Sequence, residues 1–263
     1  MNILDKIIAH KEIEVANAKS LVSIDTLKQS HFYNRETFSL KRFLLDETKT
    51  GIIAEFKRQS PSKGIINDTA DVVEVTTGYT THGASCLSVL TDNHFFGGNA
   101  SDLIKARVNN IPILRKDFII DEYQIAEAKS MGADVILLIA ACLTPDRVQE
   151  LASFAQSLQL EVLLEIHAEE ELTHICAATT IIGVNNRDLK TFTVDINRSI
   201  ALSKKIGDDK IKIAESGIHD IETISIFKKA GFKGFLIGEN FMKQANPTIA
   251  FAEFVQQLNK QER

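Results

Sequence analysis

Ionisable side chains stand at the ends of three apolar runs that have the composition of buried strands. The runs are Ile52-Ile53-Ala54-Glu55-Phe56-Lys57, Ile113-Leu114-Arg115-Lys116 and Val162-Leu163-Leu164-Glu165. Successive strand side chains alternate between faces, so Glu55 shares a face with Lys57, and Glu165 shares one with Leu163. Burying a carboxylate or an ammonium group is costly unless the group is paired. Charges at strand ends that line one cavity therefore indicate acid–base chemistry and an enzyme.

The elements that would position these charges alternate between short β-branched runs and amphipathic stretches from Gly51 onward. The predicted strands are Ile52–Lys57, Ser85–Leu90, Pro112–Asp117, Val135–Ala140, Glu161–Glu165, Ile181–Asn185, Lys212–Glu215 and Gly234–Ile237. The predicted helices are Thr69–His82, Ala100–Asn109, Asp121–Met131, Pro145–Leu158, Ala168–Ala177, Asn197–Ile206 and Ile221–Ala230. Thr144-Pro145 is a typical helix start, and Gly132 and Gly231 stand where helix C-caps are expected.

Eight strands, each followed by a helix, predict a (β/α)₈ TIM barrel of the α/β class. A doubly wound open sheet is the alternative, but such a sheet usually has fewer strands, and no G-x-G-x-x-G follows the first strand here. Residues 1–48 precede that strand and predict an N-terminal helical extension. Its expected helices are Ile3–Lys19, a short one after Ser23 and a third near Ser39–Leu45. We expect a single domain over 1–263, with this extension packed on the barrel of 49–263.

Composition and charge restrict the classes of partner. The chain has 263 residues, of which 44% are hydrophobic and 25% charged, which is ordinary for a globular protein. A net charge of −5 argues against nucleic-acid binding, which requires a basic surface. No apolar run approaches the ~20 residues of a membrane helix. Positive charge at the strand ends instead fits a small anionic substrate, and it comes from Lys57, Arg58, Lys63, Lys116 and Arg187.

The cysteines predict neither disulfides nor a metal site. Cys86, Cys142 and Cys176 are odd in number and widely spaced, and no Cys-x-x-Cys pair or His/Cys cluster occurs. Free thiols are typical of a reducing compartment, and the first residues lack a cleavable signal pattern. We therefore expect a cytoplasmic protein with no metal and no cofactor, and with neither nucleic acid nor membrane as a partner. We expect it to be a monomer or a weak homodimer.

In a (β/α)₈ barrel the active site lies at the C-terminal ends of the strands, which is where polar residues accumulate in this sequence. The strand-end segments are Glu55–Gly64, Arg115–Phe118, Glu165–His167, Gly183–Asp188, Ala214–Gly217 and Gly238–Asn240. The last two resemble a barrel phosphate site, in which backbone N–H groups hold the anion. Gly217 and Gly238 would let that backbone approach the anion closely.

Six strand-end blocks together resemble the indole-3-glycerol-phosphate synthase family. They are Glu55-Phe56-Lys57-Arg58-Gln59-Ser60-Pro61-Ser62, Ser88-Val89-Leu90-Thr91-Asp92 with Phe95-Phe96-Gly97-Gly98, Leu114-Arg115-Lys116-Asp117-Phe118, Glu165-Ile166-His167, Gly183-Val184-Asn185-Asn186-Arg187-Asp188-Leu189 and Ala214-Glu215-Ser216-Gly217-Ile218. The resemblance implies a carboxy-lyase of tryptophan biosynthesis. Its substrate would be an anionic phosphosugar–anthranilate conjugate, 1-(2-carboxyphenylamino)-1-deoxyribulose 5-phosphate, and its products indole-3-glycerol phosphate, CO₂ and water.

The resemblance also implies roles for the charged residues. Lys116 matches the general acid of ring closure, and Glu165 matches the acid–base residue of dehydration. Lys57 matches a second cation, placed near the substrate carboxylate or acting as an acid, and the division of work between the two lysines stays open. Glu55 would orient and balance the lysines. Asn185 would hold the substrate carboxylate or hydroxyl.

Further residues match binding positions of the family. Those expected at the phosphate or the sugar are Ser60, Arg187, Ser216, Gly217, Gly238 and Glu239, and those expected as walls for the aromatic ring are Phe96, Phe118 and Leu137. The block Gly238-Glu239-Asn240-Phe241-Met242 departs from many members, which have a serine or a leucine in this stretch. Backbone donors can bind phosphate whatever the side chain, so the departure leaves open only the role of the Glu239 side chain.

Each of these residues also has a structural interpretation. Lys116 or Glu165 alone could be one half of an ion pair, and Glu55 could pair with Lys57 across a barrel layer. Asn185 and Ser216 could be ordinary hydrogen-bonding loop residues, and Arg187 could brace a loop. Their joint occurrence on five strands, in the order that the family requires, favours an active site. His167 is interpreted as a structural side chain below Glu165.

Two other functions compete with this prediction. Phosphoribosylanthranilate isomerase is a phosphosugar barrel too, but it would use a Cys/Asp pair and lack both the N-terminal extension and the Glu-x-Lys of the first strand. A non-catalytic phosphosugar-binding barrel would keep Gly217 and Gly238. It would have no reason to keep Lys57, Lys116 and Glu165 together.

Overall fold

The computed structural model describes residues 3–188 and 193–261. Leu189, the last residue of the sixth-strand motif, lies outside them. Eight parallel strands close a barrel in the order β1-β10-β9-β8-β7-β6-β5-β4. They are β1 (Ile52–Phe56), β4 (Cys86–Leu90), β5 (Ile113–Lys116), β6 (Val135–Ile139), β7 (Glu161–Ile166), β8 (Ile181–Asn185), β9 (Ile211–Glu215) and β10 (Gly234–Ile237). The predicted (β/α)₈ barrel is confirmed, and every predicted strand is present to within a residue at each end.

The parallel register brings the polar strand ends to one end of the barrel. Glu165 on β7 pairs with Gly183 on β8, and Asn185 at the end of β8 pairs with Glu215 at the end of β9. Along β1, β5, β7 and β9, the inward-facing side chains change from apolar to charged between one inward position and the next, two residues later. The apolar members lie deep in the interior and include Ile53, Leu114, Leu163 and Ile213. The next inward positions on these strands are Glu55, Lys116, Glu165 and Glu215.

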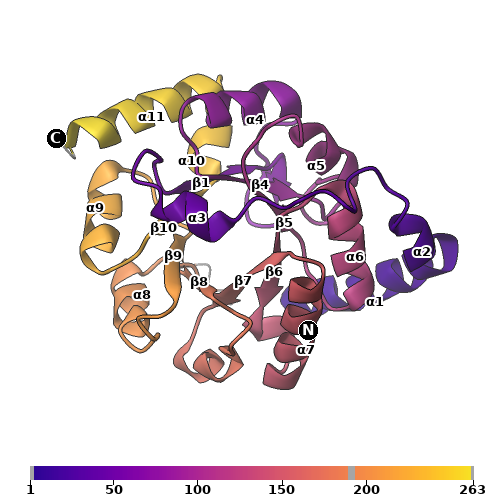
Figure 1. The fold of residues 1–263 in the computed structure, drawn as a ribbon. Coiled ribbons are helices and arrows are strands. Elements are labelled where there is room, and N and C mark those ends of the chain that lie inside the picture. Colours follow the sequence, from indigo (N-terminus) through magenta and orange to yellow (C-terminus); the bar gives the residue numbers. More distant parts are fainter. Residues whose placement is uncertain (1–2, 189–192, 262–263) are drawn as a thin grey trace.

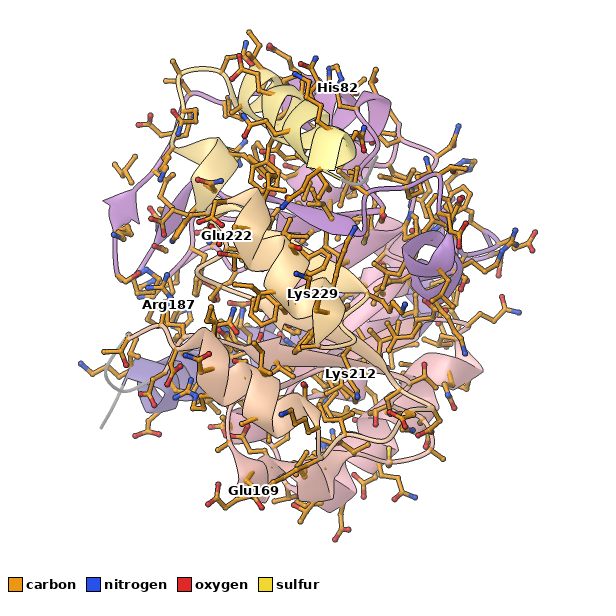
Figure 2. The ribbon with its side chains drawn as sticks, turned by 90° about the vertical axis from the view of Figure 1, so that its left-hand side faces the viewer. His82, Glu169, Arg187, Lys212, Glu222 and Lys229 are labelled. Carbon is orange, nitrogen blue, oxygen red and sulfur yellow. The ribbon has the colours of Figure 1, made fainter. Side chains whose placement is uncertain are left out.

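The helices form a ring outside the barrel (Figure 1). They are α4 (Val72–Thr81), α5 (Ala100–Ala106), α6 (Glu122–Met131), α7 (Pro145–Ser157), α8 (Ile196–Ser203), α9 (Ile221–Lys229) and α11 (Pro247–Gln261). Figure 2 faces α9 and shows Glu222, in its first turn, drawn toward the end of the molecule marked by Arg187, with Lys229 in its last turn drawn farther away. Each helix thus returns the chain to the start of the next strand. No helix within the described residues is long and apolar enough to cross a membrane.

The segment after β7 corrects one prediction. In place of an α-helix over Ala168–Ala177, the chain forms a 3₁₀ helix, η2 (Glu169–His174). The Glu171 carboxylate turns back and accepts hydrogen bonds from the backbone N–H groups of His167 and Ala168. This cap fixes a short turn, and the chain then runs directly toward β8. Four short elements were not predicted, namely β2 (Gln59–Ser60), β3 (Gly64–Ile65), η1 (Ala140–Cys142) and α10 (Glu239–Met242).

The N-terminal extension reaches both ends of the barrel. It contains α1 (Ile3–Leu21), α2 (Ile24–Leu27) and α3 (Leu40–Leu45), close to the predicted ranges. Figure 1 shows α3 in front of the strands and α1 behind them. Leu40 and Leu44 of α3 pack with the interior side chains, where they close the N-terminal end of the barrel. The start of α1 lies at the opposite end, beside the polar strand ends.

Candidate active site

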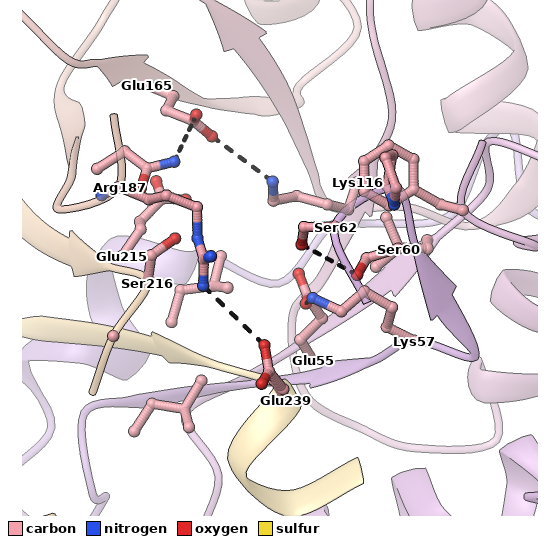
Figure 3. Close-up of a pocket in the computed structure, with 18 of the residues that line it drawn as sticks. Glu55, Lys57, Ser60, Ser62, Lys116, Glu165, Arg187, Glu215, Ser216 and Glu239 are labelled. Carbon is pink, nitrogen blue, oxygen red and sulfur yellow. Dashed lines mark hydrogen bonds and ion pairs between the residues drawn. The ribbon is translucent and has the colours of Figure 1, made fainter. Parts of the chain in front are cut away.

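A cavity with about 1270 Å³ of empty space, open to solvent on one side, lies at the C-terminal ends of the strands. Its walls hold all the predicted site residues except Leu137, namely Glu55, Lys57, Ser60, Phe96, Lys116, Phe118, Glu165, Asn185, Arg187, Ser216, Gly217, Gly238 and Glu239. They come from seven segments that are far apart in the sequence (Figure 3). The fold thus gathers into one cavity the residues that the strand-end motifs predicted separately.

Leu137 corrects one predicted wall. It is 1% exposed and belongs to the apolar interior of the barrel. Ile139, the next inward-facing residue on β6, lines the cavity in its place. The predicted wall lies one step of the strand alternation too deep, because the last inward-facing residue of β6 is Ile139 and not Leu137.

The charged side chains form two ion pairs in the wall of the cavity. Lys57 Nζ lies 2.6 Å from Glu55 Oε1, and Lys116 Nζ lies 3.5 Å from Glu165 Oε2. Asn185 Nδ2 donates to Glu165 Oε1 over 2.9 Å. The four charged side chains are therefore paired with one another and also line the cavity. Their pairing lowers the cost of burying the charges, and their exposure to the cavity leaves them able to meet a ligand.

His167, interpreted from the sequence as a structural side chain, is in contact with Glu165. Its Nε2 lies 3.0 Å from Glu165 Oε1, and its Nδ1 lies 3.6 Å from Glu171 Oε2. Burial alone would lower the pKa of His167, but the two carboxylates outweigh burial and raise this pKa to about 9. Burial alone would raise the pKa of Glu165. Lys116, His167 and Asn185 outweigh burial, so that the pKa of Glu165 falls well below its ordinary value.

Glu215 is a site residue that the sequence reasoning missed. It is 2% exposed, lines the cavity at the end of β9, and has an Oε1 atom without a hydrogen-bond partner among the described residues. A Cβ atom on Gly183 would collide with that oxygen, so glycine on the neighbouring strand is what makes room for this carboxyl group. The signal was present in the sequence, because Glu215 follows Ile213 in the same inward phase.

The environments of Glu165 and Glu215 push their pKa values apart. Burial, followed by the nearby Glu165 carboxylate, raises the pKa of Glu215 well above its ordinary value. Burial would lower the pKa of Lys116, but Glu165, Glu215 and Glu55 outweigh it and raise that pKa. These environments favour the ionised form of Glu165, the protonated form of Glu215 and the charged amine of Lys116. Such a set can donate and accept protons at the same pH.

The far side of the cavity is shaped by backbone and small residues. Ser216 and Gly217 have φ of 66° and 69°, the left-handed region that favours glycine. At Gly238, a Cβ atom would lie 2.5 Å from Glu55 Oε1, so this glycine makes room for the Glu55 carboxylate. Glu239 Oε2 lies 4.0 Å from Arg187 Nη2, and Glu239 Oε1 lies 3.8 Å from Lys63 Nζ.

An apolar wall faces the charged cluster. The rings of Phe96 and Phe118 lie 5.9 Å apart between centroids, and both line the cavity. Three residues of α1 complete the wall, Ile3, Leu4 and Ile7. The sequence reasoning treated α1 as a packing helix and did not assign these residues to the site. The described residues contain no group of three or more His, Cys, Asp or Glu side chains that could hold a metal ion.

Comparison with known proteins identifies the family. The model of the family described as "Indole-3-glycerol phosphate synthase" matches residues 4–254. The chain belongs to the indole-3-glycerol phosphate synthase family. A relative of that name from Bacteroides thetaiotaomicron is 47% identical over 258 residues, which cover 98% of this chain and 99% of the relative. Another of that name, from Polaromonas sp., is 40% identical over 257 residues, covering 96% of this chain and 97% of the relative.

Solved structures support the fold at much lower identity. A mutant tryptophan synthase α-subunit from Pyrococcus furiosus aligns with a TM-score of 0.61 at 17% identity, covering 81% of this chain and 99% of that one. A 3-hexulose-6-phosphate synthase aligns with a TM-score of 0.61 at 13% identity, covering 80% and 98%. Membership of the indole-3-glycerol phosphate synthase family makes the chain a decarboxylating lyase of tryptophan biosynthesis.

Proposed function

We propose that the cavity binds 1-(2-carboxyphenylamino)-1-deoxyribulose 5-phosphate and converts it to indole-3-glycerol phosphate, CO₂ and water. The observation that carries this proposal is the cluster of Lys116, Glu165 and Glu215, whose environments keep one carboxyl group ionised and the other protonated. Ring closure requires an acid at the ketone, and dehydration requires an acid and a base. A cavity with both, facing an aromatic wall of Phe96 and Phe118, fits a substrate that carries an aryl ring at one end.

Ring closure needs a proton at the ketone oxygen while the aromatic carbon that bears the carboxylate attacks the ketone carbon. We assign that proton to Lys116, because Glu165, Glu215 and Glu55 keep its amine protonated in the buried site. The new C–C bond interrupts the aromatic ring. Loss of CO₂ then leaves the electrons of the broken C–C bond in the ring, which restores its aromaticity.

Dehydration removes the hydroxyl that ring closure created. The hydroxyl leaves as water after it accepts a proton, and a base takes a proton from the neighbouring ring CH₂ carbon as the C–C double bond forms, so that the indole keeps its N–H. Glu165, held ionised by Lys116 and His167, is suited to the base. Glu215, held protonated, is suited to the acid. Lys57, paired with Glu55, is suited to hold the substrate carboxylate or to assist as a second acid.

The phosphate and the polar groups of the sugar are assigned to other residues that line the cavity. The phosphate is proposed to lie at Ser216-Gly217 and Gly238, with Ser60 and Arg187 beside it. The Glu239 side chain lies between Arg187 and Lys63, and we assign it the role of orienting these cations. Asn185 donates to Glu165 and is proposed to hold a substrate hydroxyl or carboxylate.

Location, assembly state and domain organisation follow from the same cavity. We infer a cytoplasmic enzyme, monomeric or weakly dimeric, because one copy of the chain supplies every proposed catalytic group. Its partner is the small anionic substrate. Residues 1–48 and the barrel are proposed to act as one domain, because Ile3, Leu4 and Ile7 of the extension are walls of the cavity. Sedimentation at several protein concentrations would test the assembly state.

A direct assay tests the activity. The purified protein is mixed with the carboxyphenylamino substrate, and indole fluorescence and released CO₂ are followed together. Both should appear in equal amounts and survive exhaustive chelation, since the two lysines supply the positive charge. In Glu165→Gln the amide keeps the size of the side chain but cannot carry the proton, so turnover should fall by about 10²-fold or more. CO₂ release without indole fluorescence in that variant would assign Glu165 to dehydration. Product from phosphoribosylanthranilate alone would favour the isomerase instead.

A further inference from the structure

Lys11 of α1 is a buried cation outside the catalytic cluster. Its side chain is 0% exposed, and its Nζ lies 3.0 Å from Asp92 Oδ2 and 3.0 Å from Asp117 Oδ1, with Glu14 Oε1 at 2.9 Å. Both aspartate side chains are fully buried. Burial alone would lower the pKa of Lys11, but Asp117 and Asp92 outweigh it, so the pKa is raised and the amine stays charged. This ion cluster joins the N-terminal extension to the ends of β4 and β5.

Each aspartate also holds the backbone of an aromatic wall residue. Asp92 Oδ1 accepts hydrogen bonds from the N–H groups of Phe95 and Phe96, at 2.8 and 3.2 Å. Asp117 Oδ1 accepts from the N–H group of Phe118 at 2.8 Å. Lys11 contacts the other oxygen of Asp92, Oδ2. In Asp117, a single oxygen, Oδ1, meets both Lys11 and the N–H group of Phe118. The ammonium group of Lys11 is therefore linked to Phe96 and Phe118 of the cavity wall through one carboxylate each.

The position of Lys11 on its helix connects it to a third part of that wall. Ile7 lies one helical turn before Lys11, on the same face of α1, and lines the cavity. A displacement of α1 would thus move Ile7 and release both aspartates together. The phosphate is proposed to lie at Ser216-Gly217 and Gly238, with Ser60 and Arg187 beside it. None of these residues contacts Lys11 in an ion pair or hydrogen bond that the structure describes.

We propose that Lys11 is a positioning residue for the aryl half of the substrate cavity. It holds α1, the segment after β4 and the segment after β5 in the arrangement that packs Phe96, Phe118 and Ile7 around the carboxyphenyl ring. This inference rests on the proposed function for the identity of the ligand. It adds that the extension sets affinity for the aryl end and leaves affinity for the phosphate end unchanged.

The test uses the full-length protein and two ligands that each represent one end of the substrate. The ligand 2-(methylamino)benzoate represents the aryl end, and its fluorescence reports its binding; inorganic phosphate represents the other end, and its inhibition constant reports that site. In Lys11→Met, the dissociation constant of the aryl ligand and the KM for substrate should both rise by about tenfold or more. The inhibition constant of phosphate should stay within about twofold of the parent value.

Lys19→Met is the matched control. Lys19 lies on the same helix and also ties it to the barrel, through an ion pair of 2.6 Å with Asp121, but both partners are partly exposed. Its loss should change neither ligand constant by more than about twofold. A general loosening of α1 would move the constants in both variants, whereas positioning through Asp92 and Asp117 would move them only in Lys11→Met.

A second variant protects the test against misfolding. Lys11→Met leaves two buried carboxylates without their cation, which destabilises a protein strongly. The double variant Lys11→Met/Asp92→Asn removes one of these charges, and the amide oxygen can still accept from Phe95 and Phe96. All measurements are made well below the unfolding temperature of each variant. The double variant should show the same loss of aryl affinity, of about tenfold, with phosphate inhibition retained.

Two outcomes overturn the proposal. One is unchanged aryl affinity and KM in folded Lys11 variants, which would make Lys11 a stabilising residue only. The other is an equal loss of affinity for both ligands, which would show that Lys11 acts on the whole cavity. Failure of the proposed function is distinguishable from either, because it would appear as a parent protein that does not convert the carboxyphenylamino substrate.

Discussion

At the N-terminal end of the barrel, Leu40 and Leu44 of α3 pack onto Ile53, Leu114 and Leu163, and the interior is closed and apolar. Two residues further along the same three strands stand Glu55, Lys116 and Glu165, which face an open cavity. The strands, their register and their alternation are shared by the two ends. What differs is the identity of one inward-facing residue on each strand.

Buried carboxyl groups near the two ends of the barrel also differ in how many of their oxygens have hydrogen-bond partners. Asp134, at the start of β6, is fully buried, and its oxygens meet Arg35, Arg107 and the backbone N–H groups of Phe38 and Ile113. Such a satisfied carboxylate contributes to the fold and has no capacity left for a ligand. At the other end, Glu215 Oε1 has no hydrogen-bond partner among the described residues. An oxygen without such a partner retains the capacity to meet a ligand or a proton.

The largest effect should come from removing the charge at the open end. Lys116→Met should keep the fold and lower turnover by about 10²–10⁴-fold, because the general acid of ring closure is lost. Lys212→Met is the matched control. Lys212 is 9% exposed on β9, away from the cavity walls, and its loss should leave turnover within about threefold of the parent. Steady-state kinetics on both variants, with circular dichroism to verify folding, checks the pair; similar losses in both would remove Lys116 from the mechanism.

The closed end should respond in stability instead of activity. Leu40 is 0% exposed in the apolar interior, so Leu40→Ala should lower the free energy of unfolding by about 2–5 kcal/mol. Leu45, on the same helix, is 50% exposed, and Leu45→Ala should change that free energy by less than about 0.5 kcal/mol. Urea unfolding gives both values, and turnover measured at a temperature where both variants are folded should be near the parent level. A large loss of turnover in folded Leu40→Ala would mean that the two ends are coupled.

How much of this the sequence could predict depends on whether the signal was local. Alternation and helix periodicity are local, and they located the strands and placed Lys116 and Glu165 on the inward face. Glu215 was missed although its phase with Ile213 is readable, because only Ser216 and Gly217 of this block were assigned to the site. Lys11 could not be predicted, because its partners Asp92 and Asp117 are distant in the sequence and a lysine between Ile7 and Val15 carries no signal of burial by itself.

At the phosphate end of the open cavity, the expected loss is in binding. Gly217 has a φ of 69°, and a Cβ atom there would collide with Val194. Gly217→Val should therefore raise KM by about tenfold or more and weaken inhibition by inorganic phosphate. Gly231 also has a positive φ, of 90°, but a Cβ atom there meets nothing within 4 Å, so Gly231→Val imposes the backbone strain without touching the cavity. If phosphate inhibits parent and Gly217→Val equally, the anion binds elsewhere.

The smallest effect should be a pH dependence of stability at the edge of the cavity. The pKa of His167 in the folded protein is raised to about 9 from an ordinary value of 6.5, chiefly because Glu165 and Glu171 overcome its burial. A raised pKa means that the charged form is stabilised by folding. This contribution is complete below about pH 6.5, and it is lost as the pH rises through about 9.

His167→Gln removes that contribution. The parent should exceed the variant in unfolding free energy by on the order of 2 kcal/mol at low pH, and the difference should shrink as the pH rises through about 9. The same substitution at an exposed histidine, His82→Gln, is the control. Urea titrations of the three proteins at several pH values between about 6 and 10 measure the differences. A gap between parent and His167→Gln that is constant with pH would show that His167 contributes packing and no charge, which would leave Lys116 as the main cation holding Glu165 ionised.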